Sequence, residues 1–568
     1  MTYQAPVREM QFYLNDVLGG GRLAGTERFA EATAEMTDAI LTEAARMADD
    51  ILAPLNWAGD QHPAKLENGV VRTSPGYIDG YRAIAEGGWV GMAAGPEHGG
   101  LGLPMTLTTC VNEMMAGSCL ALSLNPLMTQ GQIEALEHHA SDELQSLYLP
   151  KLISGEWTGT MNLTEPQAGS DVGALRSKAE PNGDGSYAVT GQKIYISWGD
   201  HDMAENVCHL VLARLPEGGP GTKGISLFLV PKYLPTEEGK PGVANTLKVV
   251  SLEHKMGLHG SPTAVMQYDG ARGWLVGPPQ GGMAAMFTMM NNARLGVGVQ
   301  GLAQAEAAYQ KALAYALERK QGRVPVEGGT GTIADHADVR RMLMTMKALT
   351  AAVRAICLDT ALSLDMARAE ESATWAARGA LLTPIAKAFG TDVGCQVAEL
   401  GVQVHGGMGY IEETGAAQFY RDARVTAIYE GTNGIQAMDL VARKLMDGGD
   451  AARALLAEVA ETVAAAPAEV GPGLREAHAA VEETLAWMLE ADGLNDRFAG
   501  SAPFLRAFGL TLGGHYLMKG ALADGGAARM ALARFMIRQL LPQVPGLCQT
   551  AREGADDLYA LDAEALAS

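Results

Sequence analysis

The feature that most constrains the fold of this chain is a long, proline-free helical pattern between residues 281 and 319. Its apolar side chains recur every three or four residues, at Met283, Met286, Met290, Leu295, Val299, Leu302, Ala305 and Tyr309. More helical stretches follow it to about Leu445. A chain of 568 residues exceeds one ordinary domain, so we expect this segment to belong to one helical domain among roughly two to four.

The sequence pattern of the N-terminal half predicts helices followed by strands. Helical spacing runs from Glu27 to about Ala53 and ends at Pro54, and further helices are predicted over residues 76–86, 104–116 and 133–149. After Trp157 the pattern changes to short apolar runs bounded by Gly, Pro and Asp, at residues 187–190, 207–213 and 225–230. Such runs are typical of an antiparallel β domain, which we expect to end near residues 269–277.

A fourth block begins at Gly448 and is rich in Ala, Leu and Glu. Residues 481–490 and 527–538 predict amphipathic helices, with a linker at 447–450 and a break at 464–473. A stripe of Leu, Met and Phe at helical spacing favours packing over cofactor binding. The sequence thus predicts an α+β fold with four domains, at residues 1–157 (helical), 158–278 (β), 279–447 (helical, of four-helix type) and 448–568 (additional helices).

Composition and charge exclude several classes of function. The formal net charge of -22 argues against a nucleic-acid surface, which needs clustered Lys and Arg. Six dispersed cysteines without CxxC spacing, and histidines without ligand spacing, indicate neither a disulfide framework nor a metal site. No secretory signal and no apolar stretch of about 18 residues is found in the sequence, so we expect no membrane span and a cytoplasmic protein.

The run from Tyr429 to Gln436, Tyr-Glu-Gly-Thr-Asn-Gly-Ile-Gln, places one carboxylate in an otherwise uncharged segment. Flanked by an aromatic ring and glycine, Glu430 can be partly desolvated, which raises its pKa and strengthens it as a base. The alternative is a solvated turn, because Gly-Thr-Asn-Gly is also good loop chemistry. These residues alone support both interpretations equally.

Tyr-Glu-Gly-Thr followed by Ile-Gln resembles the catalytic-base signature of the acyl-CoA dehydrogenases. Three more segments resemble this family in the same order: the flavin loop Met161–Asp171, the flavin strand Gly191–Gly199, and the Gln-x-x-Gly-Gly segment in Gln403–Tyr410. The resemblance spans roughly residues 40–445 and implies an acyl-CoA dehydrogenase-like fold. Tyr195 and Ser197 stand where the family usually has Trp and Thr, and Gln321-Gly322 replaces a usual Thr-Phe pair.

The resemblance implies a role for each matching residue. Glu430 is the expected base, and its backbone amide, with a flavin ribityl hydroxyl, would bind the thioester oxygen. The position of the alternative base in some relatives is occupied by Ala293, which cannot accept a proton. The expected substrate-binding residues are Ser170, Asn291, Arg294 and Gly431, although Arg294 could equally form an ion pair inside the helical bundle.

FAD is the implied cofactor, and its expected contacts fall into three groups. The loop and strand contribute Met161, Leu163, Thr164, Gly169, Ser170, Tyr195 and Ser197, with a simple turn as the alternative for the loop. Arg319, Gln321, Gln403, Gly406 and Gly407 would reach the flavin phosphates across a subunit interface. For Arg319, a solvated helix C-terminus is the alternative, and His405 is expected to be structural. Thr432 and Asn433 follow the base.

The implied function is oxidation of an acyl-CoA thioester to a trans-2-enoyl-CoA in fatty acid metabolism, with electrons passed to an electron-transfer flavoprotein. The N-terminal residues 3–14 and the C-terminal block resemble a long bacterial subgroup of the family. That subgroup implies a homodimer and a short or medium acyl chain, with 3-(methylthio)propanoyl-CoA as a candidate. The alternatives are an oxidase of the same fold that uses O2, a nucleic-acid-binding homologue without redox activity, and a catalytically idle flavin-binding scaffold.

Overall fold

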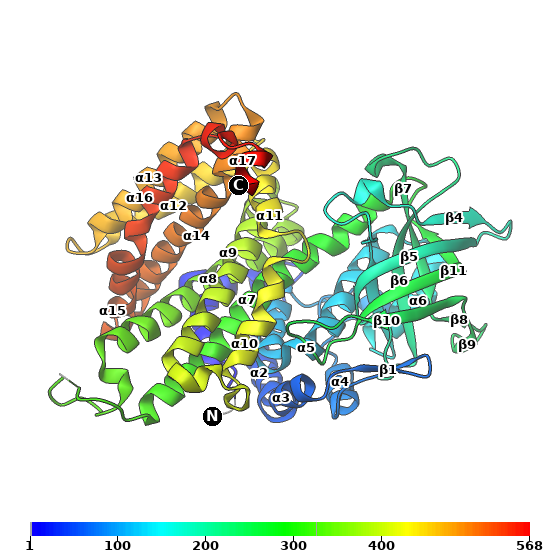
Figure 1. The fold of residues 1–568 in the computed structure, drawn as a ribbon, viewed down its shortest axis with the longest axis horizontal. Helices are drawn as coiled ribbons and strands as arrows, with labels where there is room; N and C mark the ends of the chain where they lie inside the picture. The colour runs from blue at the N-terminus through cyan, green and yellow to red at the C-terminus, as the bar shows by residue number, and fades with distance from the viewer. Residues whose placement is uncertain (1–2, 325) are drawn as a thin grey trace.

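The computed structural model describes residues 3–324 and 326–568. Figure 1 shows N-terminal helices in blue, a β domain on the right, and a larger group of helices on the left in which the chain ends. The predicted α+β class and the order of helices, strands and helices are therefore confirmed. The predicted domain boundaries stay a prediction, and the first strand after the N-terminal helices begins at Trp157.

The N-terminal part is helical apart from one small hairpin. Its elements are α1 (Val7–Phe12), α2 (Ala34–Arg46), α3 (Ala53–Gln61), β1 (Lys65–Glu67), β2 (Val70–Arg72), α4 (Tyr77–Glu86), α5 (Met105–His139) and α6 (Asp142–Ile153). The predicted helix from Glu27 to Ala53 is wrong at both ends. The helix starts after Thr33, whose hydroxyl accepts the N–H of Met36 at 3.2 Å. Helical backbone continues past Pro54, because a proline in the first turn of α3 removes no needed donor.

Helix α5 joins two segments that were predicted as separate helices. It runs through Pro126 and bends at Cys119, whose backbone is not helical (φ -154°, ψ 87°). The second predicted helix, 133–149, is instead divided at Ala140, because Ser141 caps the start of α6 by accepting the N–H of Leu144. The two halves of α5 therefore form one long buried element that reaches from the N-terminal helices to the β domain.

The β domain contains a closed circuit of paired strands. Its strands are β3 (Trp157–Asn162), β4 (Lys178–Pro181), β5 (Tyr187–Ser197), β6 (Asn206–Arg214), β7 (Ile225–Pro231), β8 (Tyr233–Pro235), β9 (Pro241–Ala244), β10 (Leu247–Leu252) and β11 (Thr263–Val276). Pairing follows β10-β11-β5-β4-β6-β3, and β7 closes the circuit between β6 and β11. The domain is not purely antiparallel as predicted, because β6 pairs in parallel with β3 and β4.

Strand β3 lies at an edge of the sheet, and α5 satisfies its free amides. Thr129 accepts the N–H of Gly159 at 3.0 Å, and Gln132 accepts the N–H of Thr160 at 3.0 Å. Unpaired backbone donors on a buried edge are costly, so these side chains stabilise the joint between helix and sheet. They also fix the start of the loop that follows β3.

The C-terminal half is entirely helical among the described residues. Its first five helices are α7 (Gly282–Glu318), α8 (Ala337–Glu370), α9 (Ala373–His405), α10 (Ala416–Ala423) and α11 (Asn433–Asp439). The additional block contains α12 (Asp450–Ala465), α13 (Gly471–Glu490), α14 (Leu494–Asp524), α15 (Ala527–Phe535), α16 (Val544–Arg552) and α17 (Ala563–Ala567). The predicted helix over 281–319 is confirmed by α7. The break predicted at 464–473 contains the observed one, which is shorter and covers only residues 466–470 between α12 and α13.

The additional helices pack on α8 and α9, in agreement with their predicted packing role (Figure 1). Arg378 of α9 joins Asp359 of α8 at 2.7 Å and Glu458 of α12 at 2.5 Å. Tyr516 of α14 donates a short hydrogen bond to the same Asp359. Asp359 is buried, Arg378 is mostly buried and Glu458 is partly exposed, and pairing across three helices limits the cost of removing the charges of Asp359 and Arg378 from water.

Helices α7 and α9 touch each other through their backbones. A Cβ on Gly298 would lie 2.6 Å from the carbonyl oxygen of Ala386, and one on Gly301 would lie 2.4 Å from that of Gly390. Atoms at these distances overlap, so neither glycine can carry a side chain unless the helices separate. The crossing therefore depends on glycine at both positions of α7.

We predict that Gly301→Ala destabilises the protein although alanine is the better helix former. The added methyl group meets backbone atoms that cannot move aside, and overpacking of this kind costs about 1–3 kcal/mol. Gly546→Ala, at an exposed position of α16 where nothing lies within 4 Å of the added Cβ, is the matched control and should stabilise by about 0.4–1 kcal/mol. The measurement is the melting temperature of each variant. Equal melting temperatures for the two variants would contradict the close crossing of α7 and α9.

Candidate active site

Glu430 lies in a strained turn directly before α11. Its φ is +54° and that of Gly431 is +84°, so the glutamate adopts the left-handed conformation that non-glycine residues avoid. Gln436 donates to the carbonyl of Glu430 at 3.1 Å, and the hydroxyl of Tyr429 donates to Gln300 at 2.5 Å. A strained residue persists only where its surroundings hold it, which favours a functional turn over a solvated one.

Side chains of α9 hold the residues after Glu430 in place through hydrogen bonds. Lys387 donates to the carbonyl of Gly431 at 2.8 Å and to Oδ1 of Asn433 at 2.9 Å, while Nδ2 of Asn433 donates to Asp392 at 2.7 Å. The side chain of Asn433 is thus engaged inside the protein, and its predicted contact with the cofactor stays a prediction. Thr432 is exposed and caps α11 by accepting the N–H of Ile435 at 3.3 Å.

Burial raises the pKa of Glu430 to about 7, even though the charges of Arg294 and Lys387 act in the opposite direction. Arg294 is itself buried and meets Asp439 only at 3.6 Å, and its Nε has no hydrogen-bond partner within the described residues. Burial lowers the pKa of this guanidinium. A half-buried carboxyl group with a pKa near neutrality is suited to accept and release a proton.

The other expected substrate contacts are less enclosed. Asn291 lies one turn before Arg294 on α7 and is exposed, and Ser170 is exposed on its loop. Ala293, at the alternative base position, is buried, and no carboxylate replaces Glu430 there. Arg294 and Gly431 are the two expected contacts that the structure brings to Glu430.

A buried ion pair shapes the loop after β3. Glu165 accepts Lys193 at 2.8 Å and also the N–H groups of Arg176 at 2.7 Å and Ser177 at 3.0 Å, while Lys193 donates to the carbonyl of Leu163 at 3.0 Å. Glu165 and Ala168 exchange backbone hydrogen bonds, which closes the turn. Met161, Leu163 and Thr164 are half-buried around it, and Gly169 and Ser170 are exposed. Sequence reasoning missed the Glu165–Lys193 pair.

Strand β5 passes this loop and presents an aromatic ring beside it. The N–H of Ile194 donates to the carbonyl of Thr164 at 2.9 Å. The next residue, Tyr195, has a φ of +61° at a β-bulge and is 63% exposed. Ser197 pairs with Thr263 at the end of the strand. An exposed ring on a strained backbone beside free loop hydroxyls and amides fits a flat heteroaromatic ligand.

The remaining expected cofactor contacts gather at the far end of α7. Arg319 follows the last residue of this helix, whose 37 residues span about 55 Å, whereas Arg294 lies in its first half. Tyr315 stacks on His405 with ring centroids 4.5 Å apart, so Arg319 lies near the segment containing Gln403, Gly406 and Gly407. Gln321 accepts Arg319 at 3.3 Å. The structure therefore brings these five residues together, but away from the base.

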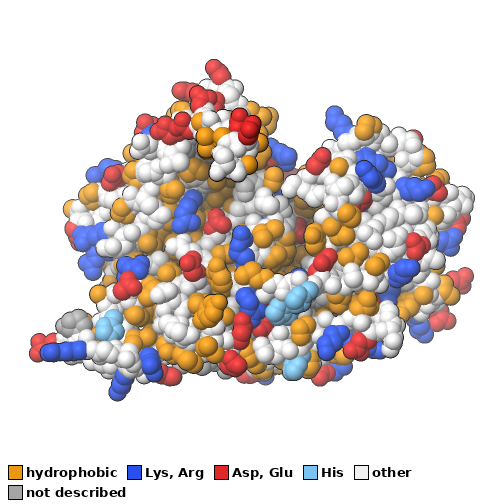
Figure 2. Space-filling view, viewed as in Figure 1, with side chains coloured by type: hydrophobic (Ala, Val, Ile, Leu, Met, Phe, Trp, Pro, Cys, Tyr) orange, Lys and Arg blue, Asp and Glu red, His pale blue; other side chains and the backbone are white. Residues whose placement is uncertain are grey.

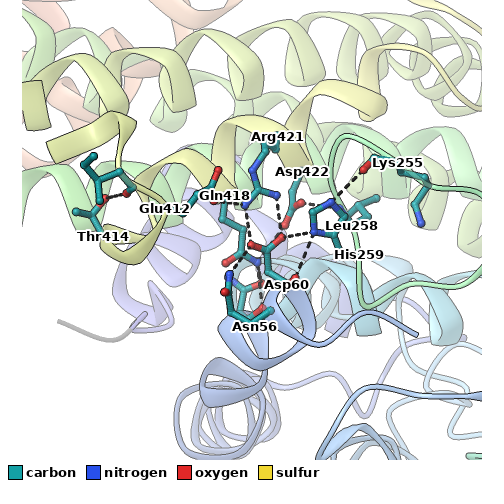
Figure 3. A network of polar contacts seen from close by, with 12 residues as sticks. Asn56, Asp60, Lys255, Leu258, His259, Glu412, Thr414, Gln418, Arg421 and Asp422 are labelled. Atoms are coloured by element: carbon teal, nitrogen blue, oxygen red, sulfur yellow. Dashed lines mark hydrogen bonds and ion pairs between the residues drawn. The ribbon is translucent and has the colours of Figure 1, made fainter. Parts of the chain in front are cut away.

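A network of polar contacts ties the β domain to both helical parts (Figure 3). Arg421 of α10 donates two hydrogen bonds, of 2.8 and 2.6 Å, to the carboxylate of Asp60 of α3. Asp422 accepts the N–H of Leu258, in the loop before β11, at 2.6 Å. Burial raises the pKa of Asp422 to about 6. Because the loop before β11 adjoins Ser197 and α10 precedes Glu430, the network sets the base relative to the flavin strand.

The molecular surface is hollowed between the additional helices at upper left and the β domain at upper right (Figure 2). Helix α11, which follows Glu430, lies on the helical side of this hollow and β7 on the other (Figure 1). Within residues 3–324 and 326–568, no helix is both long and apolar enough to cross a membrane. No group of three or more His, Cys, Asp or Glu side chains in the same ranges could hold a metal ion.

Four sequence models match successive parts of the chain. They describe the N-terminal domain (residues 35–156), the middle domain (160–271) and the C-terminal domain (280–446) of acyl-CoA dehydrogenases, and a C-terminal-like domain of acetyl-CoA dehydrogenase (455–562). Together they cover most of the chain, in the order that the structure shows.

Individual relatives agree with these matches. The chain is 44% identical to 3-methylmercaptopropionyl-CoA dehydrogenase of Ruegeria pomeroyi, over 96% of each chain. It is 34% identical to a butyryl-CoA dehydrogenase of Syntrophomonas wolfei, over 82% of this chain and 79% of that protein. The structure of an acyl-CoA dehydrogenase complexed with FAD from Bacillus anthracis has the same fold, with a TM-score of 0.76, 19% identity, and coverage of 98% and 94%. The chain belongs to the acyl-CoA dehydrogenase family.

Proposed function

We propose that this acyl-CoA dehydrogenase uses Glu430 to remove the α-proton of a short acyl-CoA thioester, with 3-(methylthio)propanoyl-CoA as the preferred substrate. The observation that carries the proposal is the enclosure of Glu430, whose pKa burial raises to about 7 in a strained turn beside the buried Arg294. Membership of the family makes the enzyme an FAD-dependent oxidoreductase. The substrate follows from the resemblance to the Ruegeria pomeroyi protein.

We propose two tasks for residue 430. Its carboxylate accepts the α-proton, so that a C–H bond breaks and an O–H bond forms on the glutamate. Its backbone N–H donates to no acceptor within the described residues, and we propose that it binds the thioester oxygen. A donor held ready where negative charge develops lowers the barrier without reorganisation. Arg294 and Gly431 would line the same pocket, with Ser170 and Asn291 at its open side.

FAD fits the surface formed by the loop after β3 and by strand β5. Tyr195 offers its exposed ring, Thr164 and Ser197 offer hydroxyls, and Gly169 and Ser170 leave their backbone open to the ligand. When bound, this cofactor accepts the hydride from the β-carbon. Met161 and Leu163 would border the ring, and Thr432 and Asn433 the side near the base. An electron-transfer flavoprotein is the proposed acceptor of the electrons.

We further propose that the enzyme is a homodimer. Arg319, Gln321, Gln403, Gly406 and Gly407 are exposed together, away from the base of their own chain, and are thus placed to serve the cofactor of a second chain. The additional helices already cover α8 and α9, which leaves less surface for a tetramer. A cytoplasmic location agrees with six cysteines that are all free thiols.

Replacing Glu430 tests the assignment of the base. Glu430→Gln should keep bound FAD and acyl-CoA affinity but reduce the rate of flavin bleaching by about 10²–10⁴-fold, since an amide cannot accept the proton. The measurement is anaerobic stopped-flow absorbance with 3-(methylthio)propanoyl-CoA, butyryl-CoA and longer thioesters. Glu413→Gln, at an exposed glutamate, is the control and should bleach at the wild-type rate. Undiminished bleaching by E430Q would overturn the assignment.

The pH dependence of kcat/KM should report the same group. Only ionised Glu430 accepts a proton, and burial raises its pKa to about 7. We therefore predict a level rate at alkaline pH and a fall of about tenfold for each unit below the midpoint. A midpoint near the ordinary pKa of a glutamate would show that the carboxyl group is solvated in the free enzyme.

The oligomeric state can be measured directly. We predict that sedimentation equilibrium or light scattering of the flavoprotein gives a mass of two chains, because the contacts expected at the flavin phosphates are divided between subunits. Arg319→Gln should weaken FAD retention without changing the pH midpoint of flavin reduction. A monomer that retains FAD fully would contradict the proposal.

A further inference from the structure

Lys387 is a fully buried cation with neutral partners. It lies on α9 with 0% of its surface exposed, and its ammonium donates to the carbonyl of Gly431 and the amide oxygen of Asn433. No carboxylate forms an ion pair with it within residues 3–324 and 326–568. The other fully buried lysine, Lys193, does have such a partner in Glu165. Burying an unpaired ammonium costs several kcal/mol, so its presence here calls for a functional reason.

The charges around Lys387 come from several elements. Glu430 is the foremost anion that stabilises its protonated form, followed by Asp392 of α9, while Arg294 of α7 opposes it. Asp392 in turn interacts electrostatically with Arg506 of α14 and with Arg424. Arg294 interacts in the same way with Asp439 and Arg443, near the end of α11. Burial lowers the pKa of Lys387 to about 8, which leaves it mainly protonated at neutral pH.

The close crossing of α7 and α9 holds both cations in place. A Cβ on Gly298 would meet the carbonyl of Ala386 and, at 3.2 Å, the N–H of Lys387, while Arg294 lies one turn earlier on α7. The backbone of Lys387 is therefore pressed against the helix that carries Arg294. Neither position can shift without opening the crossing.

We infer that Lys387 is a positioning residue for Glu430: its ammonium holds the carbonyl of Gly431, and hence the left-handed turn, and its charge is the counter-charge of the Glu430 carboxylate. The inference rests on the proposed function of Glu430 as the base. Opposite charges in a partly desolvated site favour the ionised form of each, so Lys387 lowers the pKa that burial raises.

The same charge acts during the reaction. When Glu430 takes the α-proton, its negative charge is lost, and the electron pair of the broken C–H bond stays on the substrate and spreads toward the thioester oxygen. At neutral pH, Lys387 and Arg294 keep their charges throughout the proton transfer. The positive potential at the site therefore rises as the substrate becomes negative, which is a preorganised form of stabilisation.

Two substitutions separate the two effects. Lys387→Met keeps an unbranched side chain that is shorter by one atom and removes both charge and donor, and Lys387→Gln removes the charge but keeps a donor. Both should raise the pH midpoint of anaerobic flavin reduction by about one unit, since a nearby opposite charge shifts a carboxyl pKa by roughly one to three units. Below the midpoint this is about a tenfold loss of rate, with K387Q rejoining the wild type at high pH.

Only K387M should also lower the plateau rate at high pH, because only this variant frees the carbonyl of Gly431. Thr383→Val is the matched control: it lies one turn before Lys387 on α9, is buried, donates to the carbonyl of Gly379 at 2.8 Å and carries no charge. Its midpoint should stay at the wild-type value. An unmoved midpoint in both K387M and K387Q would overturn the inference.

Thermal melting of the flavoprotein supplies a readout that does not depend on turnover. Because the pKa of Glu430 is raised, its ionisation destabilises the folded protein as pH rises from about 4.5 to about 7, so E430Q should raise the melting temperature at pH 8 but hardly at pH 5. The gain at pH 8 should be larger when E430Q is combined with K387M. An equal gain in both backgrounds would show that Lys387 does not act on Glu430.

The melting cycle separates the two proposals. If E430Q still bleaches at the wild-type rate, Glu430 is not the base, yet the cycle still measures the coupling of the two side chains. If E430Q is inactive but its gain in melting temperature is unaffected by K387M, the base assignment stands and the inference about Lys387 fails.

Discussion

The backbone contact between α7 and α9 is the constraint on which the site depends. With glycine at 298 and 301, the two helices approach until carbonyl oxygens lie where side chains would begin. This places Arg294 on one helix and Lys387 on the other, near the same turn. The turn itself is only Tyr429 to Thr432 and has no sheet or helix of its own to fix it. Its left-handed backbone is held by hydrogen bonds from Lys387 of α9 and from Gln436 of α11.

The site combines features that each cost stability. Glu430 and Tyr195 have positive φ, Lys387 is buried without an ion pair in the described chain, and the buried Arg294 meets Asp439 only at 3.6 Å. Elsewhere, buried charges are well paired, as where Arg354 joins Glu113 at 2.6 Å and Glu306 at 2.7 Å between α8, α5 and α7. The contrast indicates that Lys387 and the weakly paired Arg294 serve the reaction, since their charges keep a desolvated glutamate able to ionise near neutral pH.

Sequence reasoning found what is local and missed what is long-range. Periodicity alone gave α7 almost to the residue, and the motif around Glu430 identified the expected base. The predicted end at Pro54 failed because a proline that stops one helix also starts another. The parallel pairing of β3 with β6 could not be read from either strand. Asp60 and Arg421 are 361 residues apart, and no pattern in the sequence connects them. Lys387 is likewise a single lysine in an apolar helix, and only the fold shows that it contacts Gly431, next to Glu430.

The central claim is that residue 430 is a desolvated carboxyl group that titrates near neutrality. Infrared difference spectroscopy measures this without substrate, by following the carboxylate band of the flavoprotein between pH 4 and 9 and subtracting the spectrum of E430Q. The account predicts one carboxyl group with a midpoint of about 7 that is present in the wild type and missing from E430Q. A difference spectrum that titrates near 4.5, as a solvent-exposed glutamate does, would contradict it.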